Sequence, residues 1–188
     1  MVMVVKHPPV SNDKEAFDYV IDHLKRQDCK AMYPEGDGGC LYRVEEFRNV
    51  LKCAVGALIS VYEYGADLED QTVQYAGGVY DAISNSNPDW MVTEHSVDML
   101  IALQRLHDEV EVKDWSWLFS VIDQAIEEFG FDSIVYCPRH SRSALYSIVS
   151  MAQNHIRDGS DSRLGEWNFS EVTMDWFSDK REKAMAIA

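Results

Sequence analysis

The sequence predicts a mainly α-helical fold, a compact bundle of about six helices with at most a small two-stranded β element. Three observations predict it. Apolar residues recur at helical spacing in most segments, residues that can cap helices precede several of them, and candidate strand segments are few. At 188 residues and 46% hydrophobic composition, we expect one domain over residues 1–188, with a core over about 15–130 and a C-terminal helical extension over about 131–188.

The first half of the chain predicts three helices. One begins near Asn12, which lies three residues before Glu15 in a capping arrangement. Its apolar face carries Phe17, Val20, Ile21 and Leu24. After a stretch over 33–39 rich in Pro and Gly, we expect a second helix over 44–60, with Phe47, Leu51, Ala54, Val55 and Leu58 on one side. A weaker helix is expected over 70–83, because two adjacent glycines reduce its helix propensity.

The second half carries the clearest helical pattern. A polar loop over 84–88 is followed by Thr93, which can cap a helix that continues to Val110. Asp114 can cap the next helix, which we expect to stop at Gly130. Its apolar stripe is Trp115, Leu118, Phe119, Ile122, Ile126 and Phe129.

The last part predicts a short strand over 132–137, paired with the apolar segment over 1–5. A further helix then carries Leu145, Ile148, Val149, Ala152 and Ile156. After a polar loop over 158–162, we expect a final amphipathic segment whose apolar residues are Val172, Trp176 and Phe177.

Negative charge is concentrated in one part of the chain. Between residues 60 and 135 there are sixteen carboxylates and only two cations, Arg105 and Lys113, so this segment holds 14 of the 15 net negative charges. Such charge repels nucleic acid and anionic membranes and attracts basic partners. The residues expected to bind such a partner are Glu63, Asp67, Glu69, Asp70, Asp108, Glu109, Glu111 and Asp114.

The sequence also indicates a cellular compartment. The apolar start of the chain is too short for a signal peptide, and no run approaches the ~20 apolar residues of a membrane-spanning helix. Four dispersed cysteines do not predict a disulfide framework. We therefore expect a cytoplasmic protein with reduced thiols.

One family resemblance rests on three motifs. These are Gly39-Cys40-Leu41-Tyr42-Arg43, the segment Leu51-Lys52-Cys53-Ala54-Val55-Gly56, and Leu103-Gln104-Arg105-Leu106-His107-Asp108 followed by Trp115. They resemble a group of small uncharacterised proteins of tailed phages and prophages over roughly residues 15–130. This chain departs from the group between Arg43 and Lys52. The segment there is longer than in the group's pattern, and we expect it to be helical rather than rich in glycine. The resemblance implies no established activity.

Two metal-dependent alternatives involve the same motifs. Cys40 and Cys53, with Cys29 or a histidine, could hold zinc through thiolates and imidazole, although no ligands occur as a close pair. The His107-Asp108 dipeptide resembles that of metal-dependent phosphohydrolases, which would need another histidine nearby. His95 lies about 120° away around the same helix. We assign no metal and no cofactor.

A basic cluster follows the expected strand. Arg139, His140 and Arg142 stand before a helix and could bind an isolated phosphate or a carboxylate. Four residues rather than five separate Cys137 from Arg142, and the loop lacks glycine, so the cysteine-phosphatase pattern is not met.

The function expected from the sequence is binding rather than catalysis. We expect an acidic phage-type protein that inhibits a host protein with a basic surface, including one that normally holds nucleic acid or acts in defence. The alternative is a small metal-dependent phosphohydrolase or nucleotide-binding protein that uses His107, Asp108 and the cluster over 139–142.

Overall fold

The computed structural model of the chain describes residues 9–33, 40–46, 49–69, 71–136 and 143–157. The chain divides into two compact units, Met1–Gln153 and Asn154–Ala188, and the second is described only over 154–157. The expectation of a single domain over 1–188 stays a prediction. No helix in the described ranges combines the length and the apolar character needed to cross a membrane.

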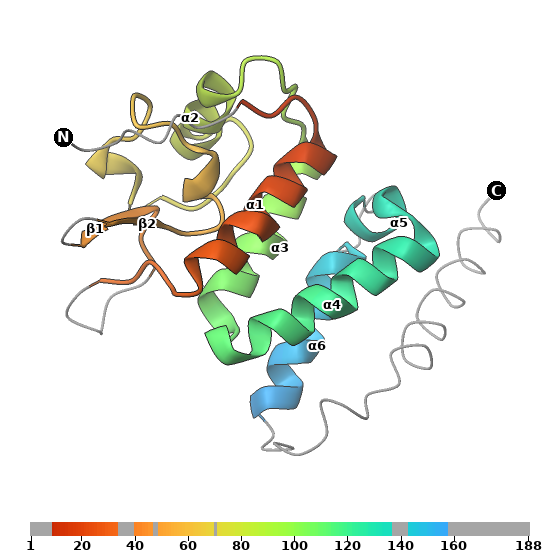
Figure 1. Cartoon of the computed structure of the whole chain (residues 1–188). Coiled ribbons are helices and arrows are strands. Elements are labelled where there is room, and N and C mark those ends of the chain that lie inside the picture. Colours follow the sequence, from red (N-terminus) through yellow and green to blue (C-terminus); the bar gives the residue numbers. More distant parts are fainter. Residues whose placement is uncertain (1–8, 34–39, 47–48, 70, 137–142, 158–188) are drawn as a thin grey trace. The chain divides into compact units, whose positions relative to one another are not determined.

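The described residues form six α-helices and one two-stranded antiparallel sheet, which confirms the mainly α prediction (Figure 1). In chain order the elements are α1 (Asp13–Gln27), β1 (Arg43–Glu46), β2 (Asn49–Lys52), the 3-10 helices η1 (Gly56–Leu58) and η2 (Ala66–Leu68), α2 (Gly78–Ser86), α3 (Glu94–Glu109), α4 (Val112–Phe129), α5 (Phe131–Val135) and α6 (Ala144–Arg157).

Helix α1 begins where the sequence predicts. The Asn12 side chain accepts a hydrogen bond from the Glu15 amide at 2.9 Å, which satisfies one of the free N–H groups of the first turn. The predicted apolar face is buried, and α1 contacts both α3 and α4. This helix therefore contributes to the core between the first and second halves of the described chain.

Helices α3 and α4 also follow their apolar stripes. Thr93 and Ser96 form a reciprocal capping box at the start of α3. Gly130 ends α4 with a φ of 82°, in the region that favours glycine. The predicted cap Asp114 is wrong, because α4 begins at Val112 after Glu111, and Asp114 lies buried in the first turn.

The predicted helix over 44–60 is wrong. Its first part is the β1–β2 hairpin, in which Arg43 pairs with Lys52 and Glu46 with Asn49. Only η1 is helical in the rest of the segment. The backbone amide of Arg43 donates to the Glu69 carboxylate at 3.2 Å, so a distant side chain holds the start of the strand. Apolar spacing within the segment does not reveal such a tertiary contact.

The predicted helix over 70–83 begins late. Gly77 has an extended backbone and α2 starts only at Gly78, then continues to Ser86 through part of the predicted loop. The fully buried Asn87 ends it. Its side-chain amide donates to the carbonyls of Leu58 at 3.0 Å and Ile83 at 2.8 Å, and its oxygen accepts from the Val10 amide at 3.1 Å.

The predicted strand over 132–137 is wrong. Residues Phe131–Val135 form α5, with Ile134 and Val135 fully buried, so their apolar side chains pack from a short helix instead. The segments over 1–5 and 158–188 lie outside the described residues. Helix α6 confirms the prediction made from its apolar spacing.

One buried carboxylate joins four segments. Asp13, in the first turn of α1, accepts from the Trp90 indole N–H at 2.7 Å and from the Ser96 hydroxyl at 2.8 Å. It also accepts from the Tyr136 hydroxyl, just beyond α5, at 3.0 Å. The start of α1 is thereby tied to the loop before α3, to α3 itself and to the end of α5.

Candidate functional site

One face of α3 lines a pocket of about 600 Å³, which we call the Asp108 pocket. Its residues from α3 stand at i, i+3, i+4, i+7 and i+8, on a side of the helix opposite much of its buried stripe. The described residues that line it are Cys40, Tyr42, Glu69, Gln71, Thr72, Val73, Ile101, Gln104, Arg105, Asp108, Glu109 and Tyr146. Four separate segments of the chain therefore meet there.

Asp108 is held at the pocket wall as a carboxylate. Its Oδ1 accepts from Gln104 Nε2 at 2.7 Å and lies 2.9 Å from His107 Nδ1. Burial raises the pKa of Asp108, but hydrogen bonds from His107, Gln104 and Cys40 outweigh it, so the pKa lies below its ordinary value. Asp108 is therefore ionised at neutral pH. The contacts with Gln104 and His107 both end on Oδ1.

His107 is fully buried and its neutral tautomer is set by the backbone. The Ala31 amide donates to His107 Nε2 at 3.2 Å, so Nε2 must present its lone pair and the ring proton of the neutral imidazole lies on Nδ1. Burial lowers the pKa of His107, but the contacts with Asp108 and Cys40 outweigh burial and raise it. A second proton, on Nε2, would face the Ala31 N–H.

Cys40, His107 and Asp108 place one ligand atom each within 4.8 Å of one another, as a metal site requires. The orientation of His107 opposes that use. A metal-bound histidine donates its other ring N–H to an acceptor, whereas Nε2 of His107 faces a donor. The three residues instead form a hydrogen-bonded network.

The Cys40 thiol belongs to the same network. Its Sγ lies 3.1 Å from His107 Nδ1 and donates to the Ala31 carbonyl at 3.1 Å. A hydrogen bond with Cys53, together with burial, raises the pKa of Cys40. The fold thus brings Cys40 and Cys53 together, as the zinc hypothesis required, but keeps Cys40 as a thiol. A thiol is a poor nucleophile and a poor metal ligand.

Glu69 has a structural task at the pocket wall. Its carboxylate accepts from the Tyr42 amide at 2.7 Å, from the Arg43 amide and from the Tyr64 hydroxyl. The Tyr42 hydroxyl donates to the Gln71 carbonyl at 2.7 Å, and burial raises the pKa of Tyr42. Glu69 therefore adds negative charge to the pocket, with its oxygens already engaged.

Arg105 brings a guanidinium group into the pocket. Its Nε donates to Glu109 at 2.7 Å, and a terminal N–H donates to the Ser150 hydroxyl at 3.2 Å. The guanidinium carbon stands 4.6 Å from the centre of the Tyr146 ring, a cation–π distance. Among the described residues, the pocket lining contains three carboxylates and this one cation, a net charge of −2.

The other acidic residues selected from the sequence lie elsewhere. Glu63 accepts from the Asn85 side chain, Asp67 is exposed within η2, and Glu111 is exposed and paired with Lys113 at 3.1 Å. Asp114 is buried and does not contribute to an exposed acidic face. Asp70 lies outside the described residues, and so do Arg139, His140 and Arg142 of the basic cluster.

Sequence reasoning missed the contributions of Gln104, Arg105 and Tyr146 to the site. Gln104 joins two motifs, since its oxygen accepts from the Val55 amide at 3.1 Å while its amide donates to Asp108. The helical spacing of Ile101, Gln104, Arg105 and Asp108 was a signal that could have placed them on one face. Nothing in the sequence pairs Tyr146 with that face.

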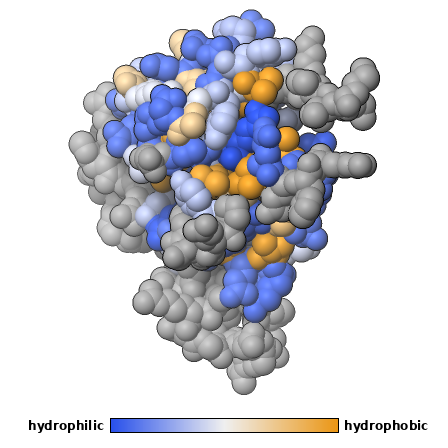
Figure 2. All heavy atoms as spheres, turned by 90° about the vertical axis from the view of Figure 1, so that its left-hand side faces the viewer, coloured by the Kyte–Doolittle hydropathy of each residue, from blue (hydrophilic) through white to orange (hydrophobic). Residues whose placement is uncertain are grey.

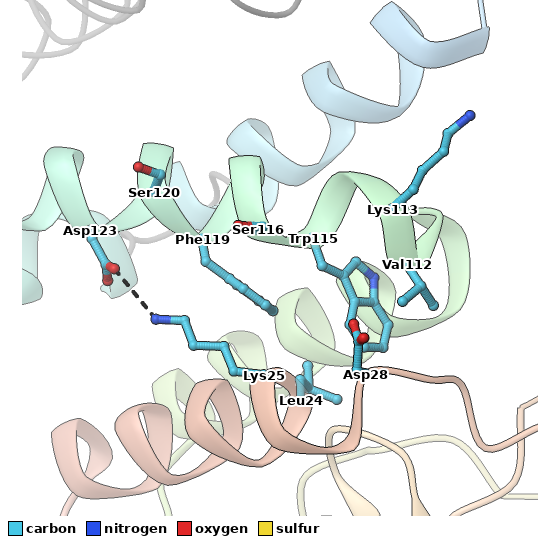
Figure 3. A pocket seen from close by; sticks show the side chains of 10 residues that line it. All are labelled: Leu24, Lys25, Asp28, Val112, Lys113, Trp115, Ser116, Phe119, Ser120 and Asp123. Carbon is cyan, nitrogen blue, oxygen red and sulfur yellow. Dashed lines mark ion pairs between the residues drawn. The ribbon is translucent and has the colours of Figure 1, made fainter.

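A second cavity, of about 580 Å³, lies where α1 and α4 meet (Figure 3). Several of its polar groups have partners: Lys25 pairs with Asp123 at 3.6 Å and stands over the Phe119 ring, and the Trp115 indole donates to the Val110 carbonyl. The lining consists of Leu24, Lys25, Asp28, Val112, Lys113, Trp115, Ser116, Phe119, Ser120 and Asp123. Two lysines balance two aspartates there, so this cavity offers no net charge to a ligand.

Comparison with known proteins gave no match. No protein-family model, curated protein or solved structure is significantly similar to this chain.

Proposed function

We propose that this chain is a binding protein that docks on a basic surface of another protein. The observation that carries the proposal is the position of Glu69, Asp108 and Glu109, which come from the acidic segment and line one pocket. A concave site with net negative charge favours a cationic group over an anionic or neutral one. The pocket is therefore the centre of the proposed interface.

The charges around the pocket support the proposal in part. Arg105 and Lys113, the two cations of the segment over 60–135, are each paired with a carboxylate of the same segment. Lys30 also lies near, donating to the Asp108 carbonyl at 2.7 Å. It lowers the local negative charge without being part of the lining.

The surface around the β1–β2 side of the molecule is largely polar. Figure 2 shows hydrophilic residues over most of the coloured part of this face, with small separate apolar areas between them. Polar surfaces that contact partners through charge give associations whose rate and affinity fall as salt rises. We propose an interface of this kind.

The partner we propose is a host protein in the bacterial cytoplasm. The resemblance to phage proteins motivates this choice, and the acidic composition suits a target that normally binds nucleic acid or acts in defence. In that role the carboxylates compete with phosphates for the same lysines and arginines. The chain would inhibit its target by occupying the basic surface, and would bind neither nucleic acid nor a membrane directly.

The metal-dependent hydrolase is the less favoured function. His107 would have to move its ring proton to Nε2 in order to bind a metal through Nδ1, and Nε2 faces the Ala31 N–H. His95, the nearest upstream histidine, packs against the Tyr136 ring with the ring centres 5.7 Å apart. This contact is not with His107 or Asp108.

The test compares capture of bacterial proteins by three forms of the full chain. Wild type and Asp98→Asn, which removes an exposed carboxylate elsewhere on α3, should retain the same basic protein. Asp108→Asn should retain at least fivefold less, because the variant removes an ionised acceptor from the pocket. The captured protein is then purified and its dissociation constant measured against salt concentration.

Two results would contradict the proposal. One is equal capture by Asp108→Asn and Asp98→Asn. The other is an affinity for the purified partner that does not change with salt, since screening must weaken an interaction between charged surfaces.

A further inference from the structure

The Asp108 pocket already contains a guanidinium group of the chain itself. Arg105 is held by a carboxylate, a hydroxyl and an aromatic face, which are the three kinds of contact that proteins use to recognise arginine. Two of these contacts, with Glu109 and Tyr146, are made by residues that line the cavity, so one wall already holds a planar cation. Arg105 pairs with Glu109, and no lysine or arginine among the described residues pairs with the Asp108 carboxylate.

Asp108 is prepared to accept a second guanidinium. Gln104 and His107 fix Oδ1 from one side, and the His107 ring is itself fixed by the Ala31 amide. The carboxylate is thus oriented before any ligand arrives, which reduces the entropy lost on binding. Its side chain is 36% exposed and lines the pocket, so a ligand can reach the carboxylate.

The size and lining of the cavity fit the rest of an arginine side chain. About 600 Å³ lies within the ~300–1,000 Å³ typical of small-ligand pockets. Ile101 and Val73 offer apolar surface to a methylene stem, and Gln71 and Thr72 add polar groups at the wall.

We infer that the Asp108 pocket binds the guanidinium group of an arginine presented by the partner protein. This inference rests on the proposed function and names its ligand. Arginine is favoured over lysine because its guanidinium is planar, more weakly hydrated than an ammonium and able to donate several hydrogen bonds to one wall of the pocket. The compact ammonium of lysine gains less from such contacts.

The test uses three small probes with the isotopically labelled full chain. N-acetyl-arginine amide, N-acetyl-lysine amide and N-acetyl-citrulline amide are titrated while NMR follows the Gln104 side-chain amide and the Arg105 Nε–H. Citrulline has nearly the shape of arginine but no charge. We expect the arginine probe to shift both signals with at least fivefold higher affinity than lysine, and citrulline to shift neither.

Variants then locate the site. Asp108→Asn keeps the shape of the side chain and an oxygen that can accept from Gln104 and His107. It should lower the affinity for the arginine probe about tenfold, because a charge-assisted hydrogen bond is lost. Asp98→Asn should leave its affinity unchanged. The wild-type comparison of arginine with citrulline needs no variant and remains decisive if Asp108→Asn folds poorly.

Each other outcome has a definite meaning. Equal binding of lysine and arginine, or of citrulline and arginine, would overturn the inference. If the arginine probe moves no pocket signal while a basic protein still binds in a salt-dependent way, the inference fails and the proposed function stands. If the arginine probe binds and no basic protein is captured, the proposed function fails and the guanidinium site stands.

Discussion

The chemistry that a polar side chain can perform in this protein depends on the groups around it. His107 would be a candidate acid, base or metal ligand in many settings, yet one backbone N–H from Ala31 makes Nε2 an acceptor. The neutral ring then acts through its Nδ1–H on Asp108, which becomes a fixed carboxylate. A backbone contact 76 residues away thus decides which chemistry the side chain can perform.

Lys52 gives a prediction at the same scale. It is half-buried, its Nζ donates to the Ile59 carbonyl at 2.6 Å, and burial with the nearby Arg43 lowers its pKa to about 8. Between about pH 8 and the ordinary lysine pKa of ~10.4, the unfolded chain binds the proton and the folded chain does not. The free energy of unfolding therefore rises with pH in this window.

The change Lys52→Met should remove that contribution. Relative to the variant, wild type should gain up to about 1.4 kcal/mol of unfolding free energy per pH unit above pH 8. Urea unfolding at pH 7.5, 8.5 and 9.5 measures it, with the exposed Lys113→Met as the control that keeps the wild-type slope. Parallel profiles for wild type and Lys52→Met would disprove the assignment.

At the scale of elements, the hairpin and the turn after it depend on close backbone approach. Gly56 begins η1 against the backbone of Tyr42, the residue just before β1. A Cβ atom on residue 56 would overlap the Tyr42 carbonyl oxygen, which is backbone and cannot rotate away. This contact positions the segment that carries Cys53 and Val55 against the segment that carries Cys40.

Gly56→Ala should therefore be strongly destabilising. We expect a loss of about 3 kcal/mol, at the upper end of the cost of overpacking. Gly77→Ala is the matched control, since its Cβ would stand 3.4 Å from the Gln74 carbonyl oxygen and its cost should stay below about 1 kcal/mol. Unfolding in urea compares the two, and similar losses would contradict the close approach.

At the scale of the molecule, Asp13 connects segments far apart in sequence. Three donors, from Trp90, Ser96 and Tyr136, end on one carboxylate at the start of α1. Trp90 and Ser96 are buried, so removing the acceptor deprives two buried donors of this partner, at a cost of ~1–3 kcal/mol each, whereas Tyr136 is exposed. The junction of α1, α3 and α5 is therefore sensitive to this residue.

Asp13→Ala should lower the free energy of unfolding by about 3 kcal/mol or more. Asp18→Ala, on the same helix, removes an exposed carboxylate paired with Lys14 and should cost less than about 1 kcal/mol. Urea unfolding of both variants tests the prediction. A loss for Asp13→Ala no larger than for Asp18→Ala would show that the junction is held by apolar packing alone.

Local patterns determined α1, α3, α4 and α6 and the concentration of negative charge. Asn12, Thr93 and Gly130 mark helix ends because their caps involve residues only a few positions away, and the stripe from Trp115 to Phe129 needs only helical periodicity. The concentration of carboxylates over 60–135 is likewise a property of composition. These features could be predicted because the interactions that produce them are short-range in sequence.

Tertiary structure decided the hairpin, α5 and the pocket. Glu69 holds the start of β1 from more than twenty residues away, Ile134 is helical rather than extended, and Asp108 meets Tyr146 and Cys40 only through folding. It also decided that His107 accepts from Ala31 and that Asp114 is buried. Such outcomes depend on which distant donors, acceptors and apolar surfaces come into contact, and local sequence periodicity contains no information on those contacts.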